Sequence, residues 1–96
     1  MKFFSTRDEK KTSFESARVI KQGLAADGGL FVPEALPTLS ETEIHELCGM
    51  SYPQRAAYVL SKFLTDYTAE ELEADCAAAY AESSFPGGAA PLVKVK

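Results

Sequence analysis

The sequence predicts a small α/β (α+β) domain with about four helices and a short sheet of about three strands. Three observations lead to this fold class. The length of 96 residues suits one domain, so we expect residues 1–96 to form a single unit. A hydrophobic content of 46% and a charged content of 25% are typical of a globular core with a solubilising surface. Four Ser/Thr-x-x-Glu/Gln capping boxes each precede an apolar stripe with helical spacing.

Three short segments have strand character. Residues 2–7 are rich in Phe, Ser and Thr and are followed by a charged turn. Residues 30–33 form an apolar run after a Gly-Gly turn and end at a proline, which predicts a buried strand. Residues 92–96, beginning at Leu92, alternate apolar and Lys side chains. We expect these three segments to form the sheet.

The first helix is predicted from a capping box with Thr12 at the N-cap and Glu15 three residues later. Gly23 is the expected stop, because glycine readily adopts the left-handed conformation that ends a helix. The apolar residues expected to face the core are Phe14, Ala17, Ile20 and Leu24.

Three further helices begin at Ser40, Ser51 and Thr68, each with Glu or Gln three residues on. Gly49 stops the first of them, and Pro53 lies in the first turn of the second, where proline is tolerated. The residues predicted to face the core are Ile44, Leu47 and Cys48 on the first, Ala56, Val59, Leu60, Phe63 and Leu64 on the second, and Leu72, Cys76, Ala79 and Tyr80 on the third.

Composition excludes several classes of function. The net charge is −4 and no stretch is rich in Lys and Arg, which disfavours nucleic acid as a partner. No apolar run approaches the roughly 18 residues of a membrane span, and the start has no signal-peptide core. Two cysteines are too few for a secreted disulfide scaffold. We therefore expect a cytoplasmic protein with no nucleic-acid or membrane partner.

No complete catalytic or metal site is predicted. His45 and Cys48 are three residues apart on one helix, and Cys76 could add a third ligand, but structural zinc takes four ligands in close pairs. A surface histidine and two buried thiols are the simpler interpretation. A metal-binding or nucleophilic mini-enzyme on these three residues stays a minor alternative. We expect no catalytic, cofactor-binding or metal residues.

Two spots could contact an anion. Ser5, Thr6 and Arg7 place two hydroxyls beside a guanidinium, which suits a phosphate or carboxylate, although an exposed strand end explains them equally well. Asp27, Gly28 and Gly29 could present backbone N–H groups as an anion nest, but a plain tight turn is the favoured interpretation.

The order of motifs along the chain closely resembles the amino-terminal domain of the threonine synthase family. The resemblance rests on Phe-Phe-Ser-Thr-Arg at 3–7, Ser-Phe-Glu-Ser-Ala at 13–17 and, most specifically, Gly-Leu-Ala-Ala-Asp-Gly-Gly-Leu-Phe-Val-Pro at 23–33. It continues through Leu-Pro at 36–37, Ser-Tyr at 51–52, Leu-Ser-Lys-Phe-Leu at 60–64 and Ala-Pro-Leu-Val at 90–93. It spans essentially the whole chain.

The resemblance implies a parent enzyme of the tryptophan-synthase-β-like fold that uses pyridoxal phosphate (PLP). Such an enzyme converts O-phosphohomoserine and water into threonine and phosphate. In the family the cofactor lysine follows the Pro-Leu-Val strand, and this chain ends before that point and lacks the glycine-rich phosphate loop. We expect the segment alone to be inactive and to bind no cofactor. Its partners would be the catalytic PLP domains of the same polypeptide, beside which it would cover part of the active-site entrance.

One position departs from the family pattern. Asp8 stands where the family usually has Gly after Ser-Thr-Arg, and its charge would weaken a phosphate grip by Arg7. Ser5, Thr6, Arg7, Asp27, Gly28 and Gly29 are therefore expected only to lie near the substrate. The alternative function is a free-standing helical protein-interaction module derived from this domain.

Overall fold

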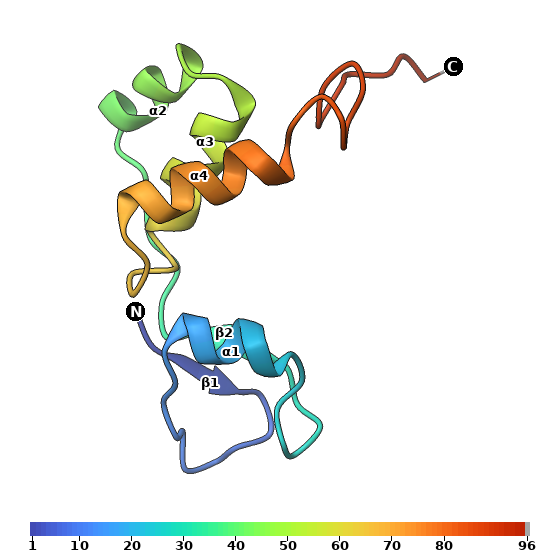
Figure 1. Ribbon diagram of the computed structural model, residues 1–96. Coiled ribbons are helices and arrows are strands. Elements are labelled where there is room, and N and C mark those ends of the chain that lie inside the picture. The colour runs from blue at the N-terminus through green and yellow to red at the C-terminus, as the bar shows by residue number, and fades with distance from the viewer. Residues whose placement is uncertain (96) are drawn as a thin grey trace.

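The chain folds into two lobes joined by a linker of residues 34–40. The computed structural model describes residues 1–95, and Figure 1 shows the elements in order. They are β1 (Phe3–Ser5), α1 (Ser16–Gln22), β2 (Phe31–Pro33), α2 (Glu41–Cys48), α3 (Tyr52–Ser61) and α4 (Ala69–Ala79). We call β1, α1 and β2 with their loops the N-terminal lobe, and α2, α3 and α4 the helical lobe. The α+β class with four helices is confirmed.

The sheet has two strands in the described residues. β1 and β2 pair antiparallel, with Phe4 opposite Val32. The predicted third strand is wrong: residues 92–95 have no strand structure, and Lys96 lies outside the described residues. A strand needs a neighbour for its backbone groups, and the side chain of Leu92 is fully exposed instead. The other edge of β1 pairs with Phe14 through an isolated bridge.

That bridge explains why the predicted start of the first helix is wrong. Phe14 and Phe3 exchange backbone hydrogen bonds of 3.0 and 2.9 Å, which keeps the chain extended through Phe14. The Thr12 amide donates to Asp8 instead of joining a capping box. Helix α1 begins at Ser16, and its N-cap Glu15 makes no side-chain capping bond. The predicted stop is confirmed, since the helix ends before Gly23 at φ 79°.

The three helices of the helical lobe begin where their capping boxes predict. The side chains of Ser40, Ser51 and Thr68 each accept the amide of the third helical residue, and a Glu or Gln closes each box. These boxes satisfy backbone donors that helix starts leave unpaired. The local signals were sufficient because all partners lie within three residues.

The core of the helical lobe lies between α3 and α4. Ala57, Leu72 and Cys76 are buried there, and partly buried side chains surround them: Ala56, Leu60, Leu64, Tyr67 and Tyr80. Four residues of this lobe that were predicted to be buried are exposed: Ile44, Cys48, Val59 and Ala79. Helix α2 has no buried residue and contributes none to this core.

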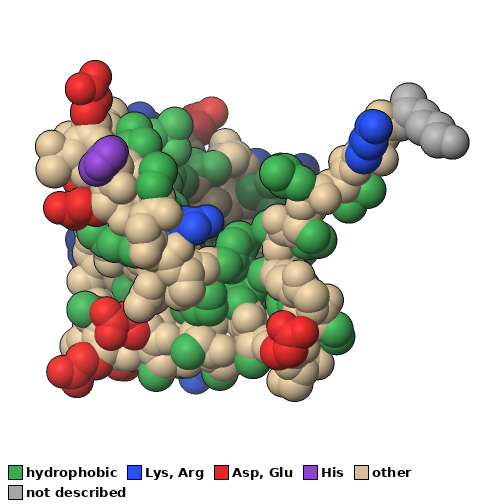
Figure 2. All heavy atoms as spheres, turned by 90° about the horizontal axis from the view of Figure 1, so that it is seen from above, with side chains coloured by type: hydrophobic (Ala, Val, Ile, Leu, Met, Phe, Trp, Pro, Cys, Tyr) green, Lys and Arg blue, Asp and Glu red, His purple; other side chains and the backbone are tan. Residues whose placement is uncertain are grey.

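Much apolar surface stays open in both lobes. Helix α1 buries Ser16, whereas the predicted core residues Ala17, Ile20 and Leu24 are exposed. Strand β2 is not the buried strand predicted, since Val32 is 41% exposed. The radius of gyration is 15.9 Å, against about 12.5 Å for a typical domain of this length. Figure 2 shows hydrophobic side chains at the surface of the helical lobe and along the projecting segment of residues 81–95, which we call the C-terminal arm. Within residues 1–95, the structure contains no helix of the length and apolarity that crossing a bilayer requires.

Candidate functional site

The structure brings together all six residues singled out from the sequence. The turn after α1 folds back onto the end of β1, where Ser5 Oγ donates a 2.6 Å hydrogen bond to Asp27 Oδ1. The Gly29 amide donates to the same oxygen at 2.9 Å, and the Arg7 guanidinium donates to the Asp27 carbonyl at 3.3 Å. Thr6 Oγ1 accepts the Leu30 amide at 3.0 Å. We call these six residues the Asp27 cluster.

Two glycines allow this close approach. Gly28 has φ 81°, which strains other L-residues, and a Cβ there would lie 2.8 Å from Arg7 Nη1. A Cβ on Gly29 would lie 2.3 Å from Ser5 Oγ and 3.0 Å from Thr6 Oγ1. The glycines are therefore required by the packing of the turn against β1.

The internal hydrogen bonds decide between two sequence interpretations. The Gly28 amide donates to the Ala25 carbonyl and the Gly29 amide donates to Asp27, so neither N–H is left for an anion nest. The tight-turn interpretation is confirmed. Hydrogen bonds from Ser5 and then Gly29 hold the pKa of Asp27 below its ordinary value, so its carboxylate stays charged. Whether the cluster lies near a substrate stays a prediction.

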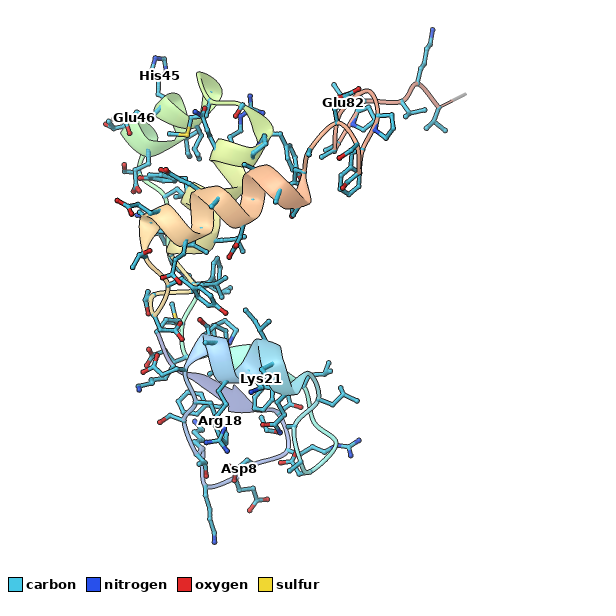
Figure 3. The ribbon with its side chains drawn as sticks, in the orientation of Figure 1. Asp8, Arg18, Lys21, His45, Glu46 and Glu82 are labelled. Atoms are coloured by element: carbon cyan, nitrogen blue, oxygen red, sulfur yellow. The ribbon has the colours of Figure 1, made fainter. Side chains whose placement is uncertain are left out.

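A cavity of about 220 Å³ adjoins the Asp27 cluster. Its walls come from α1, from the loop after β1 and from the turn itself, and its lining includes Asp8, Thr12, Phe14, Arg18, Asp27 and Phe31. Figure 3 shows that the Asp8 and Arg18 side chains extend on the same side of the N-terminal lobe. The Asp8 carboxylate accepts the amides of Thr12 and Lys10 at 3.0 Å each, and these bonds, Thr12 first, lower its pKa.

A second cluster, which sequence reasoning missed, joins the two lobes. Asp66, on the turn before α4, accepts the Ala17 amide through Oδ2 at 2.9 Å and the Ser16 hydroxyl through Oδ1. The chain's amino group donates to Thr65 Oγ1 at 2.7 Å. Asp66 thus caps α1 from about 50 residues away, and no local pattern could have indicated it.

The hydrogen bonds of this cap also change the pKa of the Asp66 carboxylate. Desolvation of this surface carboxylate works to raise its pKa, but hydrogen bonds from Ser16 and Ala17 outweigh that effect and hold the pKa below its ordinary value. A charged carboxylate also suits the positive end of the α1 helix. We call Asp66 with Ser16 and Ala17 the interlobe cap.

A third polar cluster links α2 to α3. Glu43 forms an ion pair of 2.6 Å with Lys62 and accepts a hydrogen bond from the Tyr58 hydroxyl. The bonds from Lys62 first, then Tyr58 and Ser40, lower the pKa of Glu43 to about 2. The pKa of Lys62 is raised by the same pairing, so this lysine stays protonated. Helix α2 has no buried apolar side chain, so these polar contacts are what hold it against α3.

The lysines of the described residues do not fit a Schiff base with pyridoxal phosphate. Such a lysine needs a desolvated surrounding that lowers its pKa. Lys2 pairs with Glu15 and Lys62 pairs with Glu43, and both pairings raise the pKa of the lysine. The other described lysines, at positions 10, 11, 21 and 94, are exposed.

The sulfur and imidazole groups do not converge either. Cys48 is exposed on α2, where its thiol donates to the Ile44 carbonyl at 3.4 Å, whereas Cys76 is buried between α3 and α4. Two buried thiols were predicted, so the expectation for Cys48 is wrong. Burial raises the pKa of the Cys76 thiol, which makes it less reactive. Within residues 1–95, no three metal-ligating side chains come together.

The comparison with known proteins assigns the family. The family model described as "Threonine synthase N terminus" matches residues 2–80. Because the match covers most of the chain, this protein belongs to that family of amino-terminal domains.

Particular relatives carry the name threonine synthase. The Escherichia coli K12 enzyme is 38% identical over 98 residues, which cover 100% of this chain and 21% of that protein. The Corynebacterium glutamicum enzyme is 34% identical over 89 residues, covering 88% of this chain and 18% of that protein. The mouse protein "Threonine synthase-like 1" is 35% identical over 100 residues, covering 94% of this chain and 13% of that protein.

A solved structure shares the fold. The crystal structure of threonine synthase from Escherichia coli superposes with a TM-score of 0.83 at 35% sequence identity, covering 100% of this chain and 21% of that chain. The chain thus spans between 13% and 21% of the length of these relatives.

Proposed function

We propose that this chain acts as the amino-terminal domain of a threonine synthase. The full enzyme would convert O-phosphohomoserine and water into threonine and phosphate, with pyridoxal phosphate as its electron sink. The observation that carries this proposal is the superposition of the whole chain on the E. coli enzyme at a TM-score of 0.83. Both lobes and their relative placement match a fifth of a single longer polypeptide.

The proposal divides the work between two parts of that polypeptide. The described lysines are exposed or ion-paired, so the cofactor lysine and the loop that binds the cofactor phosphate would come from the remainder. This domain would supply packing and position. Its partners would be the catalytic domains of the same chain and, through them, the substrate. Under this proposal the isolated segment is inactive and the parent works in the cytoplasm.

The exposed surface supports a large covalent partner. The accessible surface is 7,219 Å², whereas a monomer of this mass typically exposes roughly 5,400 Å². Exposed apolar side chains occur in both lobes, in the linker and in the C-terminal arm: Ile20, Leu24, Leu30, Leu36, Ile44, Leu92 and Val93. Such surface in a soluble protein marks an interaction site. We assign it to the rest of the enzyme.

A segment exchange tests the proposal. The matching segment of the E. coli enzyme is replaced by residues 1–96, and phosphate release from O-phosphohomoserine is measured. We expect the exchanged enzyme to work within about tenfold of the parent, because the exchanged residues would contribute packing and not catalytic groups; a tenfold loss corresponds to about 1.4 kcal/mol of activation free energy. The enzyme with the segment deleted should lose most of its turnover.

Two results would contradict the proposal. One is a folded exchanged enzyme that is as inactive as the deletion variant, and the other is a deletion variant with unchanged turnover. The first result would favour the free-standing interaction module, which would use the same exposed apolar side chains for a different partner.

A further inference from the structure

We propose that the cavity between α1 and the Asp27 turn binds a small zwitterion of the α-amino acid class. Its carboxylate would pair with Arg18, and its ammonium group would face Asp27 and Asp8. The groups that line the cavity carry this inference by themselves, so it is independent of the proposed function.

The positive side of the site is the Arg18 guanidinium. It lies over the Phe14 ring, 5.0 Å from the ring centroid, which holds it at the cavity wall. Lys2 and Lys62 each pair with a glutamate, whereas Arg18 takes part in no ion pair within residues 1–95. Its planar group can therefore hold a carboxylate by two parallel hydrogen bonds.

The negative side consists of two carboxylates with room for another donor. Ser5 and Gly29 both donate to Asp27 Oδ1, which leaves Oδ2 without a donor among the described residues. Each oxygen of Asp8 accepts one backbone amide, although a carboxylate oxygen has two acceptor positions. These carboxylates would repel a simple anion such as phosphate, but they attract an ammonium group.

Size and shape narrow the ligand further. The cavity volume of about 220 Å³ is below the roughly 300–1,000 Å³ of sites for drug-sized ligands, which suits a small molecule. Phe14 and Phe31 meet edge to face with centroids 5.5 Å apart and give the cavity an apolar wall. A short aliphatic side chain would pack there, between the two charged ends.

Amide chemical shifts of the full 96-residue chain test the site. L-alanine is titrated against the isotope-labelled protein, with acetate and methylammonium as probes for each half of the ligand. We expect saturable shifts at the cavity residues with alanine, and at least tenfold weaker binding of either half-probe, because each lacks one of the two charged contacts.

A matched pair of variants on the same helix sharpens the result. Arg18→Gln should weaken alanine binding tenfold or more, whereas Lys21→Gln removes the same charge from a residue that does not line the cavity and should leave binding unchanged (Figure 3). The proposal is overturned by the absence of saturable shifts, by acetate binding as tightly as alanine, or by equal losses in the two variants. The probe ratios come from the unmodified chain, so they decide even where a variant unfolds.

Discussion

The two lobes hold themselves together in different ways. The helical lobe has capped helices and a small apolar core around Ala57, Leu72 and Cys76. The N-terminal lobe buries few apolar side chains, and hydrogen bonds at the Asp27 cluster fix its turn against a two-stranded sheet. A two-stranded sheet is at best marginally stable alone. The N-terminal lobe therefore depends on contacts between residues distant in sequence, among them the interlobe cap.

The largest expected effect lies in the helical lobe. Leu72→Ala would leave a cavity in the α3–α4 core and lower the free energy of unfolding by about 3 kcal/mol. Ile44→Ala, in the same lobe at an exposed position, should change it by about 0.5 kcal/mol or less. Urea unfolding followed by circular dichroism measures both. Equal losses would show that the lobe is not organised around this core.

The next effect concerns the N-terminal lobe. Gly29→Ala places a Cβ 2.3 Å from the buried Ser5 hydroxyl and should destabilise the protein by about 2 kcal/mol. Gly49→Ala is the matched control in the helical lobe, because its φ is −87° and its nearest neighbour would be 3.7 Å away. It should stay within about 0.5 kcal/mol of the parent. An unchanged free energy of unfolding for Gly29→Ala would contradict a stabilising role for the close packing of the Asp27 cluster.

The smallest effect is the acid response of the α2–α3 link. The folded pKa of Glu43 is about 2, below its ordinary value of 4.5, so its stabilising contribution is complete above 4.5 and is lost as pH falls through 2. Glu43→Gln should flatten that part of the stability profile. Glu46→Gln, on the same helix but outside the ion pairs within residues 1–95, is the control (Figure 3). Parallel profiles for the parent and Glu43→Gln would contradict this assignment.

The difference between the lobes also explains which helix starts could be predicted from the sequence. Helices α2, α3 and α4 could be predicted because Ser40, Ser51 and Thr68 find their partners three residues away. The start of α1 could not, because Phe14 is held extended by Phe3 and the helix is capped by Asp66. Those contacts are between residues far apart in the chain.

In the candidate site, too, the local turn could be predicted from the sequence but its long-range contacts could not. The Asp-Gly-Gly pattern predicted the turn, and the positive φ of Gly28 follows from it. The contacts of this turn with Ser5, Thr6 and Arg7 depend on antiparallel pairing that brings residues about 20 apart together. The six residues could be singled out from the sequence. Their mutual hydrogen bonds, and the position of Arg18 at the edge of a cavity, could not be predicted from it.

Hydrogen exchange of Asp66→Ala tests the central claim most directly. The claim is that the N-terminal lobe relies on the interlobe cap while the helical lobe is self-supporting. The folded pKa of Asp66 is lowered, so its carboxylate is charged at pH 7 and the cap is fully formed. Removing it should cost about 1 kcal/mol, with faster amide exchange in α1 and unchanged exchange in α3 and α4. Asp66→Asn, which keeps one acceptor, should lie between. Equal acceleration in both lobes, or none in α1, would contradict the claim.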